Sequence, residues 1–123
     1  MDDNMALLVI VDAANVVGSV PDGWWRDRRG AAERLRDRLA ADGVPDSFGP
    51  AEIVLVVEGA ARGVEAVPGV RVETASGSGD DRIVELVAAA GARPRLVVTA
   101  DRELRRRVTE LGADVTGPRS VRG

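Results

Sequence analysis

The sequence contains no cysteine, no histidine and no lysine, so arginine is its only basic residue. The absence of lysine excludes a P-loop kinase, a Schiff-base enzyme and a receiver domain with its phosphate-sensing lysine. Without cysteine and histidine there is no thiol chemistry, no serine–histidine triad and almost no zinc site that the chain could build. Carboxylate chemistry is the kind of catalysis that the composition leaves open.

Long hydrophobic runs are also missing, and no segment is long enough to span a bilayer. The 123 residues are 45% apolar and 30% charged, which is typical of one globular domain and not of a disordered chain. The start, Met1 to Asn4, is acidic where a secretory signal would be basic, so we expect a cytoplasmic protein. We expect a single domain over residues 1–116 and a frayed basic tail over 117–123.

The apolar residues fall into segments typical of a parallel sheet. Residues 6–11, 53–57 and 96–99 are almost entirely apolar, as in strands that are buried on both faces. Two weaker strands are predicted over 70–73 and 113–116. These five segments alternate along the chain with stretches of a different periodicity.

Apolar residues at helical spacing predict amphipathic helices over 26–41, 80–90 and 102–111, each followed by a glycine. A fourth, short helix is predicted over 60–68. Ser78, three residues before Asp81, has the spacing of a helix cap. Strands that alternate with helices in this way indicate an α/β fold with a central, mainly parallel sheet.

Acidic side chains follow the predicted strands at one edge of this sheet. In open parallel sheets, ligands bind beyond the carboxyl ends of the strands, near the point where the strand order reverses. Four separate segments of the chain bring acids to that edge: Asp12, Glu58, Asp80 with Asp81, and Asp101.

Part of this set has an ordinary structural explanation. Asp80, Asp81 and Asp101 stand where helices begin, and negative side chains are favoured there. Asp12 and Glu58 come directly after apolar strands, where an unpaired carboxylate is costly to bury. Converging carboxylates repel one another unless a cation lies between them, either an arginine or a metal ion. Ligands that are all oxygen favour Mg²⁺ or Mn²⁺, which support phosphodiester hydrolysis without histidine or lysine.

Four motifs in order resemble one family. They are VIVDAANVV (9–17), VVEGAARG (56–63), GSGDDRIVEL (77–86) and VVTADRELRRRV (97–108), and together they cover most of the chain. The sequence resembles the PIN-like nucleases, and within them the NYN branch that includes the bacterial YacP-like proteins.

The resemblance implies a Rossmann-like three-layer α/β/α fold and a metal-dependent ribonuclease. Asp12, Asp81 and Asp101 would ligate Mg²⁺ or Mn²⁺, directly or through water, and Asp80 would contribute further. Glu58 stands where the branch often has aspartate, so its carboxylate lies one methylene further out. By the same resemblance, two polar residues complete the catalytic set. Asn15 would position Asp12 or contact the substrate. Thr99 would form a hydrogen bond within the site.

Two adjacent tryptophans, Trp24 and Trp25, stand beside several arginines outside these motifs. An exposed tryptophan next to Arg26 is a candidate stacking platform for single-stranded RNA, and Arg102 is a further candidate substrate contact. Adjacent side chains point in different directions, so at most one of the two rings packs inward easily. The alternatives are that the tryptophans hold a helix against the domain or form a homodimer contact.

The net charge of −3 counts against a nucleic-acid partner if the acids are spread over the surface. If five of them form a metal site, seventeen arginines face fifteen other acids, and the remaining surface is slightly basic. Two alternatives stay open on the sequence alone. One is a PIN-like module that binds RNA or a protein without cutting, and the other is the toxin of a toxin–antitoxin pair.

Overall fold

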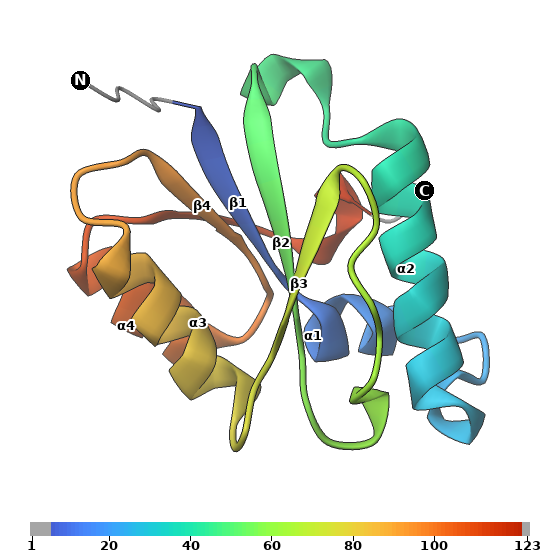
Figure 1. Cartoon of the computed structure of the whole chain (residues 1–123). Coiled ribbons are helices and arrows are strands. Elements are labelled where there is room, and N and C mark those ends of the chain that lie inside the picture. The colour runs from blue at the N-terminus through green and yellow to red at the C-terminus, as the bar shows by residue number, and fades with distance from the viewer. Residues whose placement is uncertain (1–5, 122–123) are drawn as a thin grey trace.

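A computed structural model, which describes residues 6–121, contains one five-stranded sheet in which all four strand pairings are parallel (Figure 1). The strand order is β3-β2-β1-β4-β5. The strands are β1 (Leu7–Asp12), β2 (Ala51–Val57), β3 (Val70–Thr74), β4 (Arg95–Val98) and β5 (Asp114–Thr116). The α/β class and the parallel sheet predicted from the sequence are confirmed.

Helices cover both faces of the sheet and complete three layers. They are α1 (Ala13–Gly18), α2 (Arg28–Asp42), α3 (Gly79–Ala89) and α4 (Arg102–Glu110). Figure 1 shows α1 and α2 on one side of the sheet, and α3 and α4 on the other. Each face therefore has its own apolar core.

The alternation of side chains along β1 explains why both cores are apolar. Val9 and Val11 face the core built with α1 and α2, whereas Leu8 and Ile10 face the core built with α3 and α4. Neighbouring residues of a strand point to opposite faces, so a strand that is covered on both faces must be apolar throughout. The uninterrupted apolar runs of the sequence have this cause.

Two local expectations differ from the structure. The short helix expected over 60–68 is wrong, because only a single 3₁₀ turn, Gly59–Ala61, forms there. The helix expected from residue 26 begins at Arg28, because the Asp27 side chain accepts a hydrogen bond from the Gly30 N–H and caps the helix. Helix α1 was not expected, since its sequence AANVVG continues the apolar pattern of the strand before it.

The tail expected to fray, 117–123, instead packs over the part that the structure describes. Residues Pro118–Ser120 form a 3₁₀ turn, in which Pro118 is buried. Val121 is 7% exposed and belongs to the core on the α1 and α2 side. Two apolar side chains are enough to anchor the segment, because the turn places both of them against the body of the domain. Arg122 and Gly123 lie outside the described residues.

The strand order reverses at the carboxyl end of β1, and this reversal point is called the crevice below. This strand lies between β2 and β4, and the chain leaves it toward β2 before it returns on the other side as β4. At such a reversal the loops after the two strands lead to opposite faces of the sheet. The acidic start of the chain, Met1 to Asn4, lies outside the described residues. In residues 6–121 no helix is long and apolar enough to cross a membrane.

Candidate active site

Asp12 lies at the crevice and is the most buried acid of the predicted site. It is the last residue of β1, and only 5% of it is exposed. Its Oδ2 accepts a hydrogen bond of 2.9 Å from Thr99 Oγ1, and its Oδ1 accepts one of 3.4 Å from the Asn15 N–H. Asp12 is thus the N-cap of α1 as well as the end of a central strand.

Thr99 and Asn15 connect the ends of β1 and β4 across the crevice. Thr99 Oγ1 accepts a hydrogen bond of 3.1 Å from the Asp101 N–H while it donates to Asp12. Asn15 Oδ1 accepts one of 2.8 Å from the Ala100 N–H. Two side chains therefore fix the loop after β4 relative to Asp12, and both belong to the predicted catalytic set.

The surroundings of Asp12 disfavour its charged form. Burial raises the pKa of Asp12 from its ordinary value of 3.8 to about 6, although the hydrogen bonds from Thr99 and Asn15 oppose this rise. The negative charges of Asp80 and Glu58 raise the pKa further. A carboxylate that is buried next to other carboxylates favours either a proton or a cation close to it.

The first turn of α3 contains two adjacent acids with different surroundings. Asp80 is half-buried, and burial together with the charges of Asp101 and Glu58 raises its pKa, while Arg107 opposes the rise. Asp81 is exposed, and its Oδ1 lies 3.1 Å from Arg107 Nη2 of α4. The structure therefore places Asp80, rather than Asp81, beside the other acids of the crevice.

Glu58 follows β2 and lies against the start of α3. A Cβ placed on Gly79 would lie 2.6 Å from Glu58 Oε1 and 3.1 Å from its Cδ. Because real Cβ contacts are not that short, the position of the Glu58 carboxylate depends on glycine at residue 79. Nothing in the sequence pattern predicts this contact, since the two residues are 21 positions apart.

Asp101 lies on the other side of the crevice, at the start of α4. Its Oδ1 accepts a hydrogen bond of 2.9 Å from the Leu104 N–H and caps the helix, as the sequence predicted. Its charge also acts on Asp80. Here the name acid cluster is used for Asp12, Glu58, Asp80 and Asp101.

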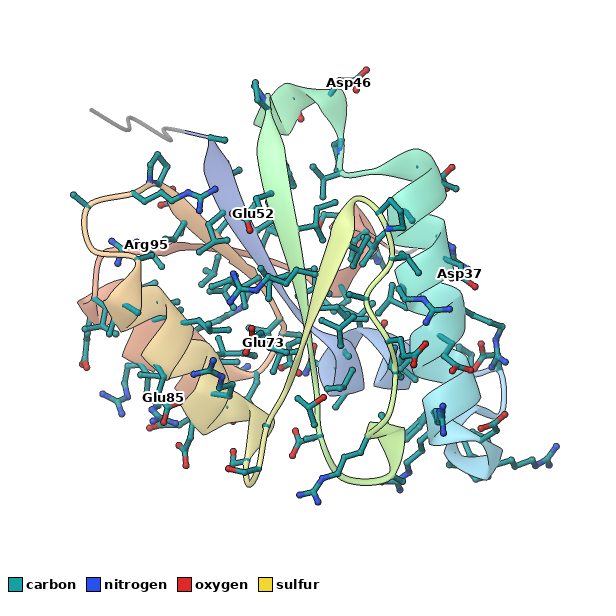
Figure 2. All side chains as sticks on the ribbon, in the orientation of Figure 1. Asp37, Asp46, Glu52, Glu73, Glu85 and Arg95 are labelled. Carbon is teal, nitrogen blue, oxygen red and sulfur yellow. The ribbon has the colours of Figure 1, made fainter. Side chains whose placement is uncertain are left out.

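In the part of the chain that the structure describes, the acid cluster lacks the ion pairs that hold many of the other acids. Along the sheet and α3, Glu52, Glu73 and Glu85 lie within 2.7–3.1 Å of arginine nitrogens (Figure 2). Within residues 6–121, none of the four cluster carboxylates forms an ion pair with an arginine. The chain has seventeen arginines. Among the described residues, eight other acids form such pairs and six do not, so the particular feature of the cluster is that its unpaired acids act on one another.

The donor set of the crevice fits Mg²⁺ or Mn²⁺ in chemistry, since all the candidate ligands are oxygens. The side chains as they stand do not yet form a coordination sphere: in the described part of the chain, no three acids are placed closely enough to hold an ion. Within residues 6–121 neither Glu58 nor Asp80 forms an ion pair, and both are half-buried, so a bound ion would have to draw the two side chains toward Asp12.

The other predicted substrate residues lie outside the acid cluster. Trp24 is half-buried, whereas Trp25 is 55% exposed, so only one of the two rings packs inward. Arg26 is exposed and lies 5.8 Å from the centre of the Trp25 ring. Arg102 is the exposed first residue of α4, next to Asp101.

Comparison with known proteins supports the fold. No protein-family model matches the chain, and no curated protein matches it. Among solved structures, Rae1 (YacP) from Bacillus subtilis matches with a TM-score of 0.68 at 21% identity, over 98% of this chain and 71% of the other. A tryptophan-to-leucine variant of the same protein matches with a TM-score of 0.69 at 20% identity, over 92% and 70%. The chain therefore has the α/β fold of Rae1 (YacP).

Proposed function

We propose that the protein is a divalent-metal-dependent ribonuclease that hydrolyses RNA phosphodiester bonds at the acid cluster. One observation carries the proposal. Four carboxylates from four separate segments lie around the crevice closely enough to act on one another and, within residues 6–121, none forms an ion pair with an arginine. Like charges held near the buried Asp12 are costly, and a cation that offsets the repulsion explains best why the fold keeps them there.

Asp12, Glu58, Asp80 and Asp101 are the proposed metal ligands, and Mg²⁺ or Mn²⁺ the proposed ions. Such ions, when bound, activate a water molecule and stabilise the leaving oxygen of a phosphodiester. Asp81, a ligand by resemblance, takes an outer position in this proposal because it is paired with Arg107. In the assignment based on the sequence, Asp81 is a ligand and Asp80 a further contributor, whereas here Asp80 is the ligand and Asp81 lies further out.

Thr99 and Asn15 act as positioning residues in this site. Thr99, the residue after β4, donates a hydrogen bond to Asp12 Oδ2 and so fixes the orientation of that carboxylate. Asn15 accepts a hydrogen bond from the Ala100 N–H and so holds the loop after β4. Arg26 and Arg102 are both exposed, and they are the proposed contacts to RNA phosphates. A homodimer contact through the exposed Trp25 stays a prediction.

Cleavage of a mixed pool of single-stranded RNA in the presence of Mn²⁺ or Mg²⁺ is the expected result with the purified protein. Addition of a chelator should stop the reaction, and excess metal should restore it, because within residues 6–121 no arginine forms an ion pair with the acid cluster that could replace the metal. The products are separated on a denaturing gel. An RNA pool that stays intact at every concentration of both metals would overturn the proposal.

The same assay distinguishes the two alternatives left by the sequence. A PIN-like module that binds without cutting would retard RNA, or a partner protein, and leave the RNA intact. A toxin would cleave RNA and also arrest growth when expressed, with relief by a neighbouring antitoxin. Growth that is unaffected by expression of an active nuclease would remove the toxin alternative.

Gly79→Ala is expected to weaken metal binding and slow cleavage roughly 10-fold, through the position of Glu58 rather than through the fold. The new Cβ would meet the end of a flexible side chain, so Glu58 has to turn away from Gly79. Alanine is the better helix former, so the unfolding free energy should change by less than about 1 kcal/mol. Mn²⁺ affinity by calorimetry and urea unfolding measure the two effects.

A double-mutant cycle provides the control. In a Glu58→Ala background there is no carboxylate to displace, so adding Gly79→Ala should leave Mn²⁺ affinity unchanged. If Gly79→Ala weakens binding equally in both backgrounds, its effect does not pass through Glu58, and the contact has no role in the site.

A further inference from the structure

A pocket of about 330 Å³ adjoins the acid cluster on the α1 and α2 side of the sheet. Glu58 forms part of its wall and belongs to the acid cluster as well. Small apolar side chains make up much of the rest, including Ala13, Val17 and Ala61, and Trp24 and Arg28 complete it. The pocket is thus apolar inside, with one aromatic ring, one cation and one carboxylate among its lining groups.

Trp24 is held in place as one wall of this pocket. A Cβ on Gly18 would lie 3.7 Å from Trp24 Cζ2, so the ring rests directly against α1. The Trp25 ring meets it edge-on, with centroids 5.9 Å apart and planes at 87°. The guanidinium of Arg28 lies 5.3 Å from the centre of the Trp24 ring. The Trp24 ring is therefore in contact with α1, with Trp25 and with Arg28.

A flat aromatic group with a nearby negative charge fits these walls best. Stacking on tryptophan stabilises a base whatever its identity, because every base has a π face. Arg28 supplies the positive charge that a phosphate attached to such a group requires. A protein partner would instead be expected on a broad surface, whereas this pocket is small and concave.

The position of the pocket relative to the acid cluster sets which part of a nucleic acid reaches it. Because Glu58 borders both, a base in the pocket would bring its own sugar and phosphate toward the side of the pocket that Glu58 shares with the cluster. A base inside a duplex has both faces covered by its neighbours and is not available for stacking on a protein ring. Occupation of the pocket therefore requires an unpaired base.

We propose that this pocket receives one unpaired nucleobase of the RNA strand, with Trp24 and Arg28 as the residues that make the protein specific for single strands. The inference rests on the proposed ribonuclease function, since it takes the strand cut at the acid cluster as the ligand. It assigns the stacking role to Trp24 and the pocket, rather than to the exposed Trp25.

The test measures binding without cleavage, in a chelator, by the quenching of tryptophan fluorescence. The protein has only two tryptophans, so Trp25→Phe leaves Trp24 as the reporter. A single-stranded oligoribonucleotide should quench Trp24 saturably, while the same sequence as a blunt duplex, or as a strand of abasic sugar-phosphates, should bind at least about 10-fold more weakly. Equal binding of all three ligands overturns the proposal.

Paired variants separate the pocket from its surroundings. Trp24→Leu is expected to weaken single-strand binding about 5- to 100-fold, and Trp25→Leu to weaken it less; equal or reversed losses place the base on the exposed ring and overturn the proposal. Arg28→Ala should weaken binding more than Arg34→Ala, which removes the same charge from the same helix outside this pocket. Equal losses from the two arginine variants also overturn it.

Ala14→Leu covers the case in which Trp24→Leu fails to fold. Ala14 is exposed on α1 and lines the pocket, so a leucine there should block the pocket and weaken single-strand binding without loss of any core contact. If single-strand binding by Ala14→Leu is unchanged, the proposal that the pocket receives a base is overturned. The two proposals can be rejected separately. Cleavage that persists unchanged in Trp24→Leu would contradict the proposed base pocket only. Quenching by single strands without cleavage in any metal would contradict the proposed ribonuclease function only.

Discussion

Replacement of Asp12 by asparagine is expected to abolish RNA cleavage and, without divalent metal, to make the fold more stable at neutral pH. Asparagine keeps one oxygen to accept from the Asn15 N–H and cap α1, its amide N–H can donate to Thr99 Oγ1 in place of the second oxygen, and it carries no charge to be buried. Loss of a metal ligand should lower kcat/KM by about 10²-fold or more. The Asp12 carboxylate is thus needed for the proposed reaction, and without metal it lowers the stability of the fold.

The pH dependence of stability follows from the raised pKa of Asp12. A carboxyl with a pKa of about 6 in the folded state and 3.8 in the unfolded state binds its proton more tightly when folded. Its protonated form therefore stabilises the fold below about pH 4, and this contribution is lost as the pH rises through 6. The loss amounts to about 3 kcal/mol at most, and the asparagine variant does not have it.

Urea unfolding in a chelator at about pH 4 and about pH 7.5 measures this difference. The variant should exceed the wild type in unfolding free energy by about 1–3 kcal/mol at the higher pH and by much less at the lower. Mn²⁺ should raise the melting temperature of the wild type but not of the variant. Asp114→Asn, at an exposed position on β5, is the matched control and should change nothing. A variant less stable than the wild type at neutral pH would contradict the burial argument.

Asp80→Asn and Asp81→Asn are expected to differ greatly in their effect on cleavage, although the two residues are adjacent. Asp80 lies among the acids of the crevice, so its replacement should lower kcat/KM by about 10²-fold. Asp81 makes an exposed ion pair with Arg107, and the loss of such a pair costs about 0.2–1 kcal/mol of stability at most, with less than about 3-fold in rate.

The two variants control for each other. Both remove one negative charge from the first turn of α3, so any effect of the helix dipole is common to both. Steady-state kinetics at saturating metal and thermal unfolding are compared side by side. A larger loss for Asp81→Asn would contradict the structural assignment and restore the order of ligands that the family resemblance implies.

Much of the fold could be predicted from the sequence because its signals are local. A strand buried on both faces must be apolar at each position, and the runs ending at Val11, Val57 and Val98 have this property. Glycines and capping residues mark the helices that follow. The two wrong predictions of helices also have local causes. The sequence AANVVG is as apolar as the strand before it, so helix α1 could not be distinguished from that strand. The segment 60–68 forms only a single 3₁₀ turn in place of the expected helix.

Most of the acid cluster could also be predicted, because the ends of parallel strands necessarily lie at one edge of the sheet. The choice between Asp80 and Asp81 was not made from the sequence, although the helical spacing contains a signal for it. Successive residues of a helix differ in direction by about 100°, and which of them meets Asp12 depends on how α3 is rotated against the sheet. That rotation is set by the burial of Ile83 and Val87, which follow Asp80 by three and seven residues and so lie on its side of the helix.

The sequence by itself determined a parallel α/β sheet, a set of acids at its carboxyl edge, and the exclusion of histidine, cysteine and lysine chemistry, since composition and periodicity are properties of the chain alone. The tertiary structure alone decided which acids meet, that Glu58 rests against Gly79, that Trp24 borders a pocket shared with the acid cluster, and that Val121 packs in the core. These contacts join residues distant in sequence, and only the packing of helices on the sheet brings them together.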